Sequence, residues 1–271
     1  MRYNRSHGAI LTIAVAAWCL IPAAAPPANG TLQVRPVPYL YTSAETNSAV
    51  AKDLERELAR YRRDHLLNRA TPSFSQAQRV FEQLVPGAGQ ESDTESGFEW
   101  ALYVHAGRWA EAYARAGGKI VLSEPFLDRY RLDDSELALV IGHEMVHAIC
   151  EHERVQLSAL LRNSAPHPLY IGDAIALLGG EEPDAVPDLS LIHRLENIAD
   201  REGLRLAARA GFNPASAIQF FAKLERLDQD PGFFPPTHES PVLRRAHLQH
   251  DNFWLSLVPT MFQRTTVDCR S

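Results

Sequence analysis

The residues best suited to chemistry in this chain are two histidines and a glutamate, in the run His143-Glu144-Met145-Val146-His147. They lie in the apolar stretch 135–153, which contains no proline and only one glycine, so we expect a buried helix. On a helix, residues four positions apart are displaced by about 40° and about 6 Å. Both imidazoles can therefore converge on one cation, and imidazole nitrogen is a donor that Zn²⁺ prefers.

Glu144 is offset by about 100° from His143 on such a helix. That offset makes it a poor third ligand but leaves it able to take a proton from an attacking water as general base. Two imidazoles and one carboxylate at this spacing match what metal-assisted peptide hydrolysis requires. In a chain with eleven histidines, the alternative is two histidines at the edge of the core with a salt-bridging glutamate.

A catalytic zinc site needs a third protein ligand and leaves the fourth position to water. His152 follows His143 by nine residues, which on an unbroken helix is about 180° of rotation. No glycine lies between His147 and His152 to break the helix. We therefore expect His152 at a helix end or on the surface, pointing away from the metal.

Glu196 is the better candidate for the third ligand. It lies in a second helical stretch, 190–211, and Asp200 follows it by one turn on the same face. Glu196 would bind the metal, and Asp200 would accept the outer N–H of a ligating histidine. The alternative is a solvated acidic face paired with Arg194 and Arg201.

The two helical stretches, with Gly211-Phe212-Asn213-Pro214 after the second, resemble the gluzincin family that includes the CAAX prenyl endopeptidases, HtpX and BepA. Members carry H-E-x-x-H on one helix and E-x-x-x-D on another, and the resemblance covers about residues 97–250. It implies an α+β, mainly helical fold, namely a zincin-like metalloprotease domain with a small sheet and an H-E-x-x-H active-site helix. It also implies one Zn²⁺ per chain, held by His143, His147 and Glu196.

Two further segments resemble family elements less closely. The segment 237–244 is similar to a Thr-His-Pro element followed by an arginine, with Glu239 after the histidine. The resemblance implies that His238 donates to the oxyanion and that Arg244 positions His238 or the substrate. His238 as a latent-state lid ligand or as an ordinary loop residue stays open. The segment 111–122 resembles the strand before the zinc helix, and its part at 119–122 could pair with an extended substrate.

The termini and the charge give the organisation of the chain. Arg2 and Arg5 precede the apolar run 9–25, which predicts a signal peptide over 1–28 and export to the periplasm. The alternative is an uncleaved inner-membrane anchor, the one route to membrane association that we expect. Beyond residue 30 the chain has 25 basic and 33 acidic groups, a net charge of −8, which argues against nucleic acid as a partner.

After the leader we expect an N-terminal helical segment over 29–96, the zinc metalloprotease domain over 97–250 and a C-terminal tail over 251–271. Patterning predicts helices at 43–67, 73–84 and 215–227, and a loop or short helix at 169–189. Strands are expected at 98–105 and 119–123, either side of a Gly117-Gly118 turn. Cys150 and Cys269 permit one disulfide, although Cys150 also suits a buried apolar position.

These features predict a zinc-dependent metalloendopeptidase that acts on protein or peptide substrates. The resemblance to the periplasmic members implies a role on unfolded envelope proteins in quality control. The alternative function is a zinc-dependent, chaperone-like binding protein of the same fold with little proteolysis. The presence of Glu144 favours the enzyme, because a binding protein has no need of a general base.

Overall fold

A computed structural model describes residues 39–89, 97–108, 111–163, 170–179, 189–227, 240–250 and 267–269. The predicted leader, His238 and most of the expected tail lie outside these ranges. The described chain is mainly helical with one small sheet, which confirms the predicted fold class. The helices are α1 (Ser43–Arg63), α2 (Pro72–Leu84), the short 3₁₀ turn η1 (Val85–Gly87), α3 (Glu124–Tyr130), α4 (Asp134–Ile149), α5 (His152–Asn163), α6 (Ile171–Gly179), α7 (Leu189–Arg209), α8 (Ser216–Leu227) and α9 (Pro241–His250).

The sheet has the strand order β1-β3-β2, with β1 at Ala101–His105, β2 at Ala112–Arg115 and β3 at Lys119–Ser123. The central strand β3 pairs parallel with β1 and antiparallel with β2. The Gly117-Gly118 turn therefore joins β2 to β3, and the expectation that it separates the strands at 98–105 and 119–123 was wrong. Both glycines have positive φ, which suits the tight turn between β2 and β3.

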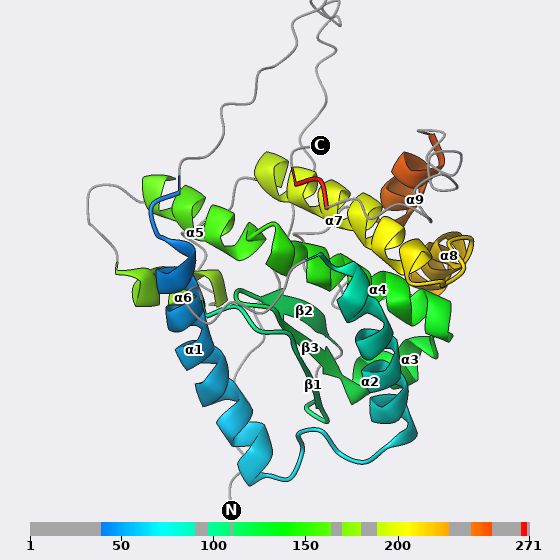
Figure 1. Ribbon diagram of the computed structural model, residues 1–271, viewed down its shortest axis with the longest axis horizontal. Coiled ribbons are helices and arrows are strands. Elements are labelled where there is room, and N and C mark those ends of the chain that lie inside the picture. The colour runs from blue at the N-terminus through cyan, green and yellow to red at the C-terminus, as the bar shows by residue number, and fades with distance from the viewer. Residues whose placement is uncertain are drawn as a thin grey trace, which may run out of the picture. The chain divides into compact units, whose positions relative to one another are not determined.

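Helix α4, which carries the H-E-x-x-H run, is the centre of the fold (Figure 1). The Asp133 side chain accepts from the Glu136 amide and the Glu136 carboxylate accepts from the Asp133 amide, which forms a capping box at the start of the helix. Side chains on all faces of α4 are buried, among them Leu137, Ile141 and Met145. A helix that is apolar all round needs neighbours on every side.

Helix α7 is the closest of those neighbours. It crosses α4 where Gly142 of α4 meets Gly203 of α7, and a Cβ added at Gly142 would lie 2.8 Å from the carbonyl oxygen of Gly203. A Cβ added at Gly203 would lie 2.6 Å from the amide nitrogen of His143. The two backbones are thus in contact beside the first histidine of the motif, which only glycine permits.

The remaining helices pack on both sides of this centre. Helix α2 shares the main hydrophobic cluster with α4, through residues such as Phe81 and Leu84. A second cluster joins α1, α5 and α6 through Val50, Leu157 and Ile175. In Figure 1, α1 lies to one side of the sheet and α2 and α3 to the other.

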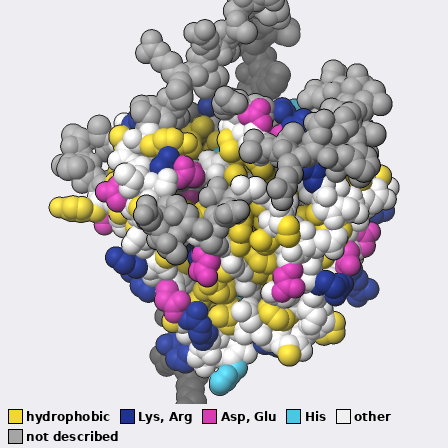
Figure 2. All heavy atoms as spheres, in the orientation of Figure 1, with side chains coloured by type: hydrophobic (Ala, Val, Ile, Leu, Met, Phe, Trp, Pro, Cys, Tyr) yellow, Lys and Arg dark blue, Asp and Glu magenta, His cyan; other side chains and the backbone are white. Residues whose placement is uncertain are grey.

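On the face drawn in Figure 2, acidic and basic side chains are interspersed, and hydrophobic side chains gather across the middle. Within the described ranges, no helix combines the length and hydropathy that crossing a membrane requires.

Candidate metal centre

The structure brings three of the predicted ligands together between α4 and α7. The Nε2 atoms of His143 and His147 lie 3.0 Å apart. The Glu196 carboxylate lies 3.4 Å from Nε2 of His143 through Oε2 and 3.3 Å from Nε2 of His147 through Oε1. The two histidines of α4 and the glutamate of α7 thus form one possible metal site.

With one donor atom from each residue, the three atoms lie within 4.8 Å of one another, which is close enough for them to share one zinc ion. Ligands at about 2.0–2.1 Å from Zn²⁺ lie about 3.3 Å from one another in a tetrahedron. Two imidazole nitrogens and a carboxylate are also the donor set of catalytic zinc sites. Oxygen-preferring cations such as Mg²⁺ and Ca²⁺ are not suited to a pair of imidazoles.

Asp200 and Arg244 lie behind His143. Nδ1 of His143 is 2.9 Å from Oδ1 of Asp200, which leaves Nε2 free to bind a cation once Nδ1 carries the proton. The Arg244 guanidinium, from α9, donates two hydrogen bonds to the same carboxylate, one of 2.8 Å from Nε and one of 2.5 Å from a terminal nitrogen. The expected role of Asp200 as the outer partner of a ligand is thus matched in geometry. The structure buries Arg244 against Asp200, and its expected role toward His238 stays a prediction because His238 lies outside the described residues.

The electrostatics of the site favour a positive charge at His143. Burial alone would lower the pKa of His143, but the Asp200 and Glu196 carboxylates outweigh it and raise that pKa to about 10. Burial would raise the pKa of Asp200, but Arg244 and then His143 lower it to about 2, so the carboxylate stays ionised. This negative field stabilises a bound cation as it does a proton.

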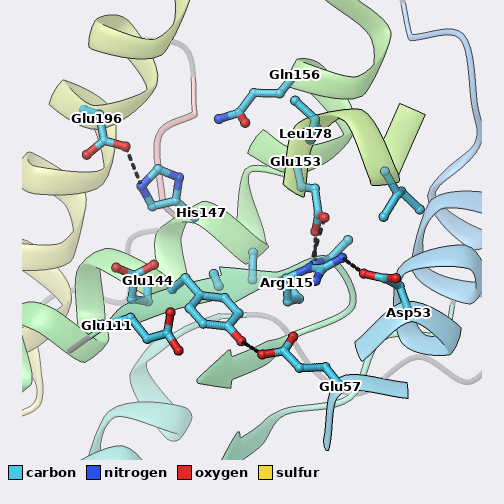
Figure 3. A pocket seen from close by; sticks show the side chains of 16 residues that line it. Asp53, Glu57, Glu111, Arg115, Glu144, His147, Glu153, Gln156, Leu178 and Glu196 are labelled. Atoms are coloured by element: carbon cyan, nitrogen blue, oxygen red, sulfur yellow. Dashed lines mark hydrogen bonds and ion pairs between the residues drawn. The ribbon is translucent and has the colours of Figure 1, made fainter. Parts of the chain in front are cut away.

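Glu144 lies beside the three ligands and lines the same pocket as His147 and Glu196 (Figure 3). The pocket has a volume of about 450 Å³. Burial raises the pKa of Glu144, and the positive charge of His143 opposes this. A carboxylate held with a raised pKa next to a metal site is suited to accept a proton and to return it.

The far wall of the pocket is made by α1, β2 and α5. Arg115 of β2 pairs with Asp53 of α1 and with Glu153 of α5, both at 3.1 Å, and the next hydrogen bond along the wall is donated by Tyr113 to Glu57 at 2.7 Å. Figure 3 shows Arg115 with Asp53 and Glu153 on the side of the pocket opposite Glu144 and His147. Helix α6, in the region expected to be a loop or short helix, adds Ile175 and Leu178 to the lining.

The expected helix-end position of His152 is confirmed, but its side chain is buried and turned toward His147, so the expectation that it points away was wrong. Helix α4 ends at Ile149, Glu151 takes a left-handed φ of 52°, and His152 begins the new helix α5. Its side chain is buried, with 2% of the residue exposed. Nδ1 of His152 lies 2.9 Å from Nδ1 of His147, on the side of that ring away from the other ligands.

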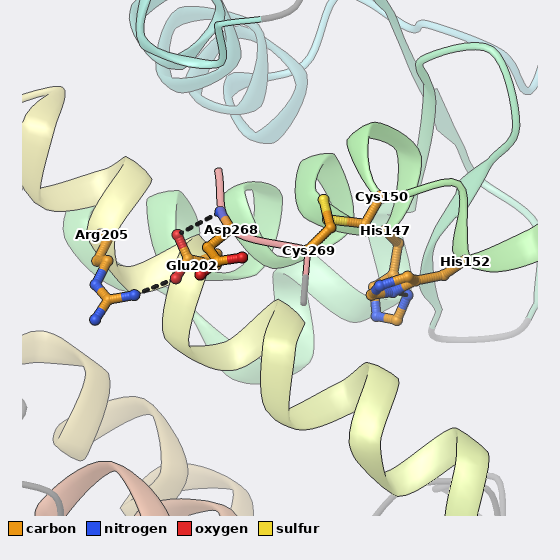
Figure 4. Close-up of a disulfide and its surroundings, with 7 residues drawn as sticks. All are labelled: His147, Cys150, His152, Glu202, Arg205, Asp268 and Cys269. Carbon is orange, nitrogen blue, oxygen red and sulfur yellow. Dashed lines mark hydrogen bonds and ion pairs between the residues drawn. A yellow bond between two sulfur atoms is a disulfide. The ribbon is translucent and has the colours of Figure 1, made fainter. Parts of the chain in front are cut away.

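The interruption between helices α4 and α5 is also where the C-terminal residues are attached to the fold. Cys150 is bonded to Cys269, so the permitted disulfide is present (Figure 4). Val267 packs against the cluster formed by Val146, Cys150 and Ile198. His238 lies outside the described residues, and neither its place nor its predicted role is described by the structure.

Residues 73–252 match the family described as Peptidase family M48, so the match begins in α2, ahead of the boundary expected at residue 97. A mitochondrial metalloendopeptidase OMA1 of Schizosaccharomyces pombe is 23% identical over 234 residues, which cover 84% of this chain and 66% of the relative. An Arabidopsis thaliana protein of the same name is 29% identical over 164 residues, 58% of this chain and 32% of the relative.

A third relative is the Beta-barrel assembly-enhancing protease of Yersinia pestis. It is 31% identical over 129 residues, which cover 42% of this chain and 26% of the relative. The alignments thus span about two thirds of the fission-yeast relative and about a third or less of the other two.

Proposed function

The chain belongs to peptidase family M48, and we propose that it is a zinc-dependent metalloendopeptidase that cleaves extended segments of unfolded proteins in the cell envelope. The observation that carries the proposal is the convergence of His143, His147 and Glu196, whose donor atoms lie within 4.8 Å of one another, with Glu144 in the same pocket. The alternative of a chaperone-like binding protein has no comparable use for a buried carboxylate beside the ligands.

His143, His147 and Glu196 would hold the Zn²⁺ ion, which when bound supplies a Lewis acid and lowers the pKa of water to about 7. Glu144 accepts the proton of the attacking water and holds that proton while the carbonyl carbon becomes tetrahedral. It then transfers the proton to the departing amine. Asp200 holds the Nδ1 proton of His143, and Arg244 keeps Asp200 ionised.

The strand that would bind substrate is β2. The sequence pointed to 119–122, but β3 occupies those residues and is paired on both edges, so it has no room for another strand. The amide of Ser123 donates to the carbonyl of Glu111 at 2.9 Å, which makes this a hydrogen-bonded antiparallel pair. Because such pairs recur at every second residue, Ala112 and Ala114 direct their N–H and C=O groups away from β3.

An extended substrate laid along that edge would gain main-chain hydrogen bonds without sequence selection. Residues 112–116 all line the pocket that contains Glu144 and His147, so a strand paired there would run past the ligands. Folded proteins hold their backbone groups in their own hydrogen bonds, and unfolded segments supply free ones. This geometry supports unfolded chains as the substrate class.

The charge of the pocket favours one kind of substrate side chain over another. Among its lining residues are six carboxylates and a single guanidinium, that of Arg115, which two of the carboxylates already pair. A basic side chain of the substrate would be attracted into this pocket, and an acidic one would be repelled. The leader-like sequence 1–28 and the envelope-related name of the Yersinia pestis relative support an exported, periplasmic site of action.

The test is proteolysis of unfolded casein by the purified protein with zinc, with a chelator, and with the Glu144→Gln variant. We expect wild-type cleavage, its loss on chelation, and a fall of several orders of magnitude for Glu144→Gln with zinc stoichiometry unchanged. Fractionation of cells that express the full chain tests the site of action, where a soluble periplasmic pool is expected. Substantial cleavage by the Gln variant would show that Glu144 is not the base, and a purely membrane-bound pool would favour the anchored alternative.

A further inference from the structure

His152 stands where the outer partner of a metal-ligating histidine is required. His147 directs Nε2 toward His143 and Glu196, at 3.0 and 3.3 Å, and directs Nδ1 toward His152 at 2.9 Å. The other ligand ring has the same arrangement, with Nε2 on the shared site and Nδ1 on Asp200. The two histidines thus have equivalent outer contacts, one to a carboxylate and one to a second imidazole.

The geometry points to His152 as the positioning residue of His147: its neutral imidazole accepts the Nδ1–H of His147 and so fixes the tautomer that presents Nε2 to zinc. This inference rests on the zinc site proposed above. His147 can bind a cation through Nε2 only when its own proton is on Nδ1. Nδ1 of His152 must then be the acceptor, and the proton of His152 must be on Nε2.

His152 lies inside the protein against His147, with 2% of the residue exposed. The rings of His147 and His152 meet nearly edge to face, with an interplanar angle of 85° and centroids 4.8 Å apart. Figure 4 shows the two rings together beside the Cys150–Cys269 bond.

The arrangement has a cost to folding that argues against a purely structural role. Within the described residues, Nε2 of His152 is buried and makes no hydrogen bond. A buried donor without a partner costs about 1–3 kcal/mol. An apolar side chain of similar size would avoid that cost, so the imidazole is better explained by what its Nδ1 does for His147.

The backbone between α4 and α5 places His152 next to His147. On an unbroken α4 the side chain of residue 152 would point away, as the sequence suggested. The left-handed Glu151, at φ 52°, ends α4 and redirects the chain so that the first residue of α5 turns back toward His147. A non-glycine residue in that conformation is itself uncommon.

The test compares His152→Leu, which removes the acceptor, with His152→Asn, whose Oδ1 takes a similar place to Nδ1 and can accept. The zinc dissociation constant is measured for each full-length protein by competition with a chromogenic chelator. We expect His152→Leu to weaken zinc binding by about 10–100-fold and His152→Asn to recover most of that loss. His65→Asn, an exposed histidine outside the pocket with a positive φ that asparagine tolerates, is the control.

Urea unfolding of the zinc-free proteins separates positioning from packing. We expect His152→Leu to unfold at the same or a higher urea concentration than wild type, since it removes a buried unpaired donor. Equal zinc affinity of His152→Leu and wild type would overturn the inference, and so would a variant that loses zinc only because its zinc-free form is unstable. Failure of the wild-type protein itself to bind zinc would instead overturn the proposed function.

Discussion

Gly203 on α7 lies against His143 on α4 so closely that a Cβ at residue 203 would be 2.6 Å from the His143 amide nitrogen and 2.8 Å from its Cα. Residues 196, 200 and 203 share one face of α7, because four and seven residues are close to one and two helical turns. The same face that presents Glu196 to the metal and Asp200 to His143 therefore also sets how near α7 can come. The separations of 3.4 and 3.3 Å between Glu196 and the two histidines span the two helices and depend on this contact.

Substituting Gly203 by alanine should therefore damage the metal site without touching a ligand. The added methyl group meets backbone atoms, so the helices must move apart, at a cost of about 1–3 kcal/mol in the free energy of unfolding. We expect zinc retention after dialysis to fall together with proteolysis. Gly172→Ala on α6 is the matched control, because a Cβ there meets nothing within 4 Å. Full zinc occupancy in Gly203→Ala would show that the close crossing does not position Glu196.

The buried pair of Arg244 and Asp200 gives a second prediction. Their side chains are 7% and 4% exposed, and Arg244→Leu would leave the Asp200 carboxylate without its cation. Removing one partner of a buried pair costs about 3–5 kcal/mol, measured by urea unfolding. The double variant Arg244→Leu with Asp200→Asn should recover part of that loss, because the uncompensated charge is gone. Additive effects of the two substitutions would argue that the pair is not coupled.

Much of the metal site could be predicted because its signals are local. The spacing of His143 and His147, and of Glu196 and Asp200, depends only on the helical repeat, and Asp133 with Glu136 specifies the helix start in the same way. The third ligand required one further step, the convergence of two helices, which was inferred from the need of zinc for a third donor and supported by the resemblance to a known family.

What was missed depends on contacts between distant segments or on an uncommon backbone conformation. The direction of the His152 side chain was missed because a helix break was thought to need glycine, whereas Glu151 makes the left-handed turn itself. The contact at Gly142 had a visible signal, since a lone glycine inside a helix indicates close packing. Nothing local to Arg244 indicates Asp200 as its partner, 44 residues away in sequence.

The Cys150–Cys269 bond gives a third prediction. It joins residues 119 positions apart, so its loss frees a long stretch of the unfolded chain. Cys269→Ser should lower the free energy of unfolding by about 2–4 kcal/mol. A reducing agent should bring the wild-type protein to the stability of the variant and leave the variant unchanged. If reduction destabilises both proteins equally, the bond is not the source of the effect.

The last prediction concerns the free edge of β2. Ala114→Pro removes an N–H that points away from β3, and proline is tolerated on an edge strand where the donor faces outward. If substrate pairs with this edge, the variant should cleave extended peptides with a raised KM while zinc content and stability stay near wild type. Ala114→Ser, which keeps the N–H and adds a small polar side chain, controls for the change of side chain. Unchanged kinetics for Ala114→Pro would show that substrate does not pair with β2 through residue 114. A loss of zinc in that variant would show instead that the strand supports the metal site.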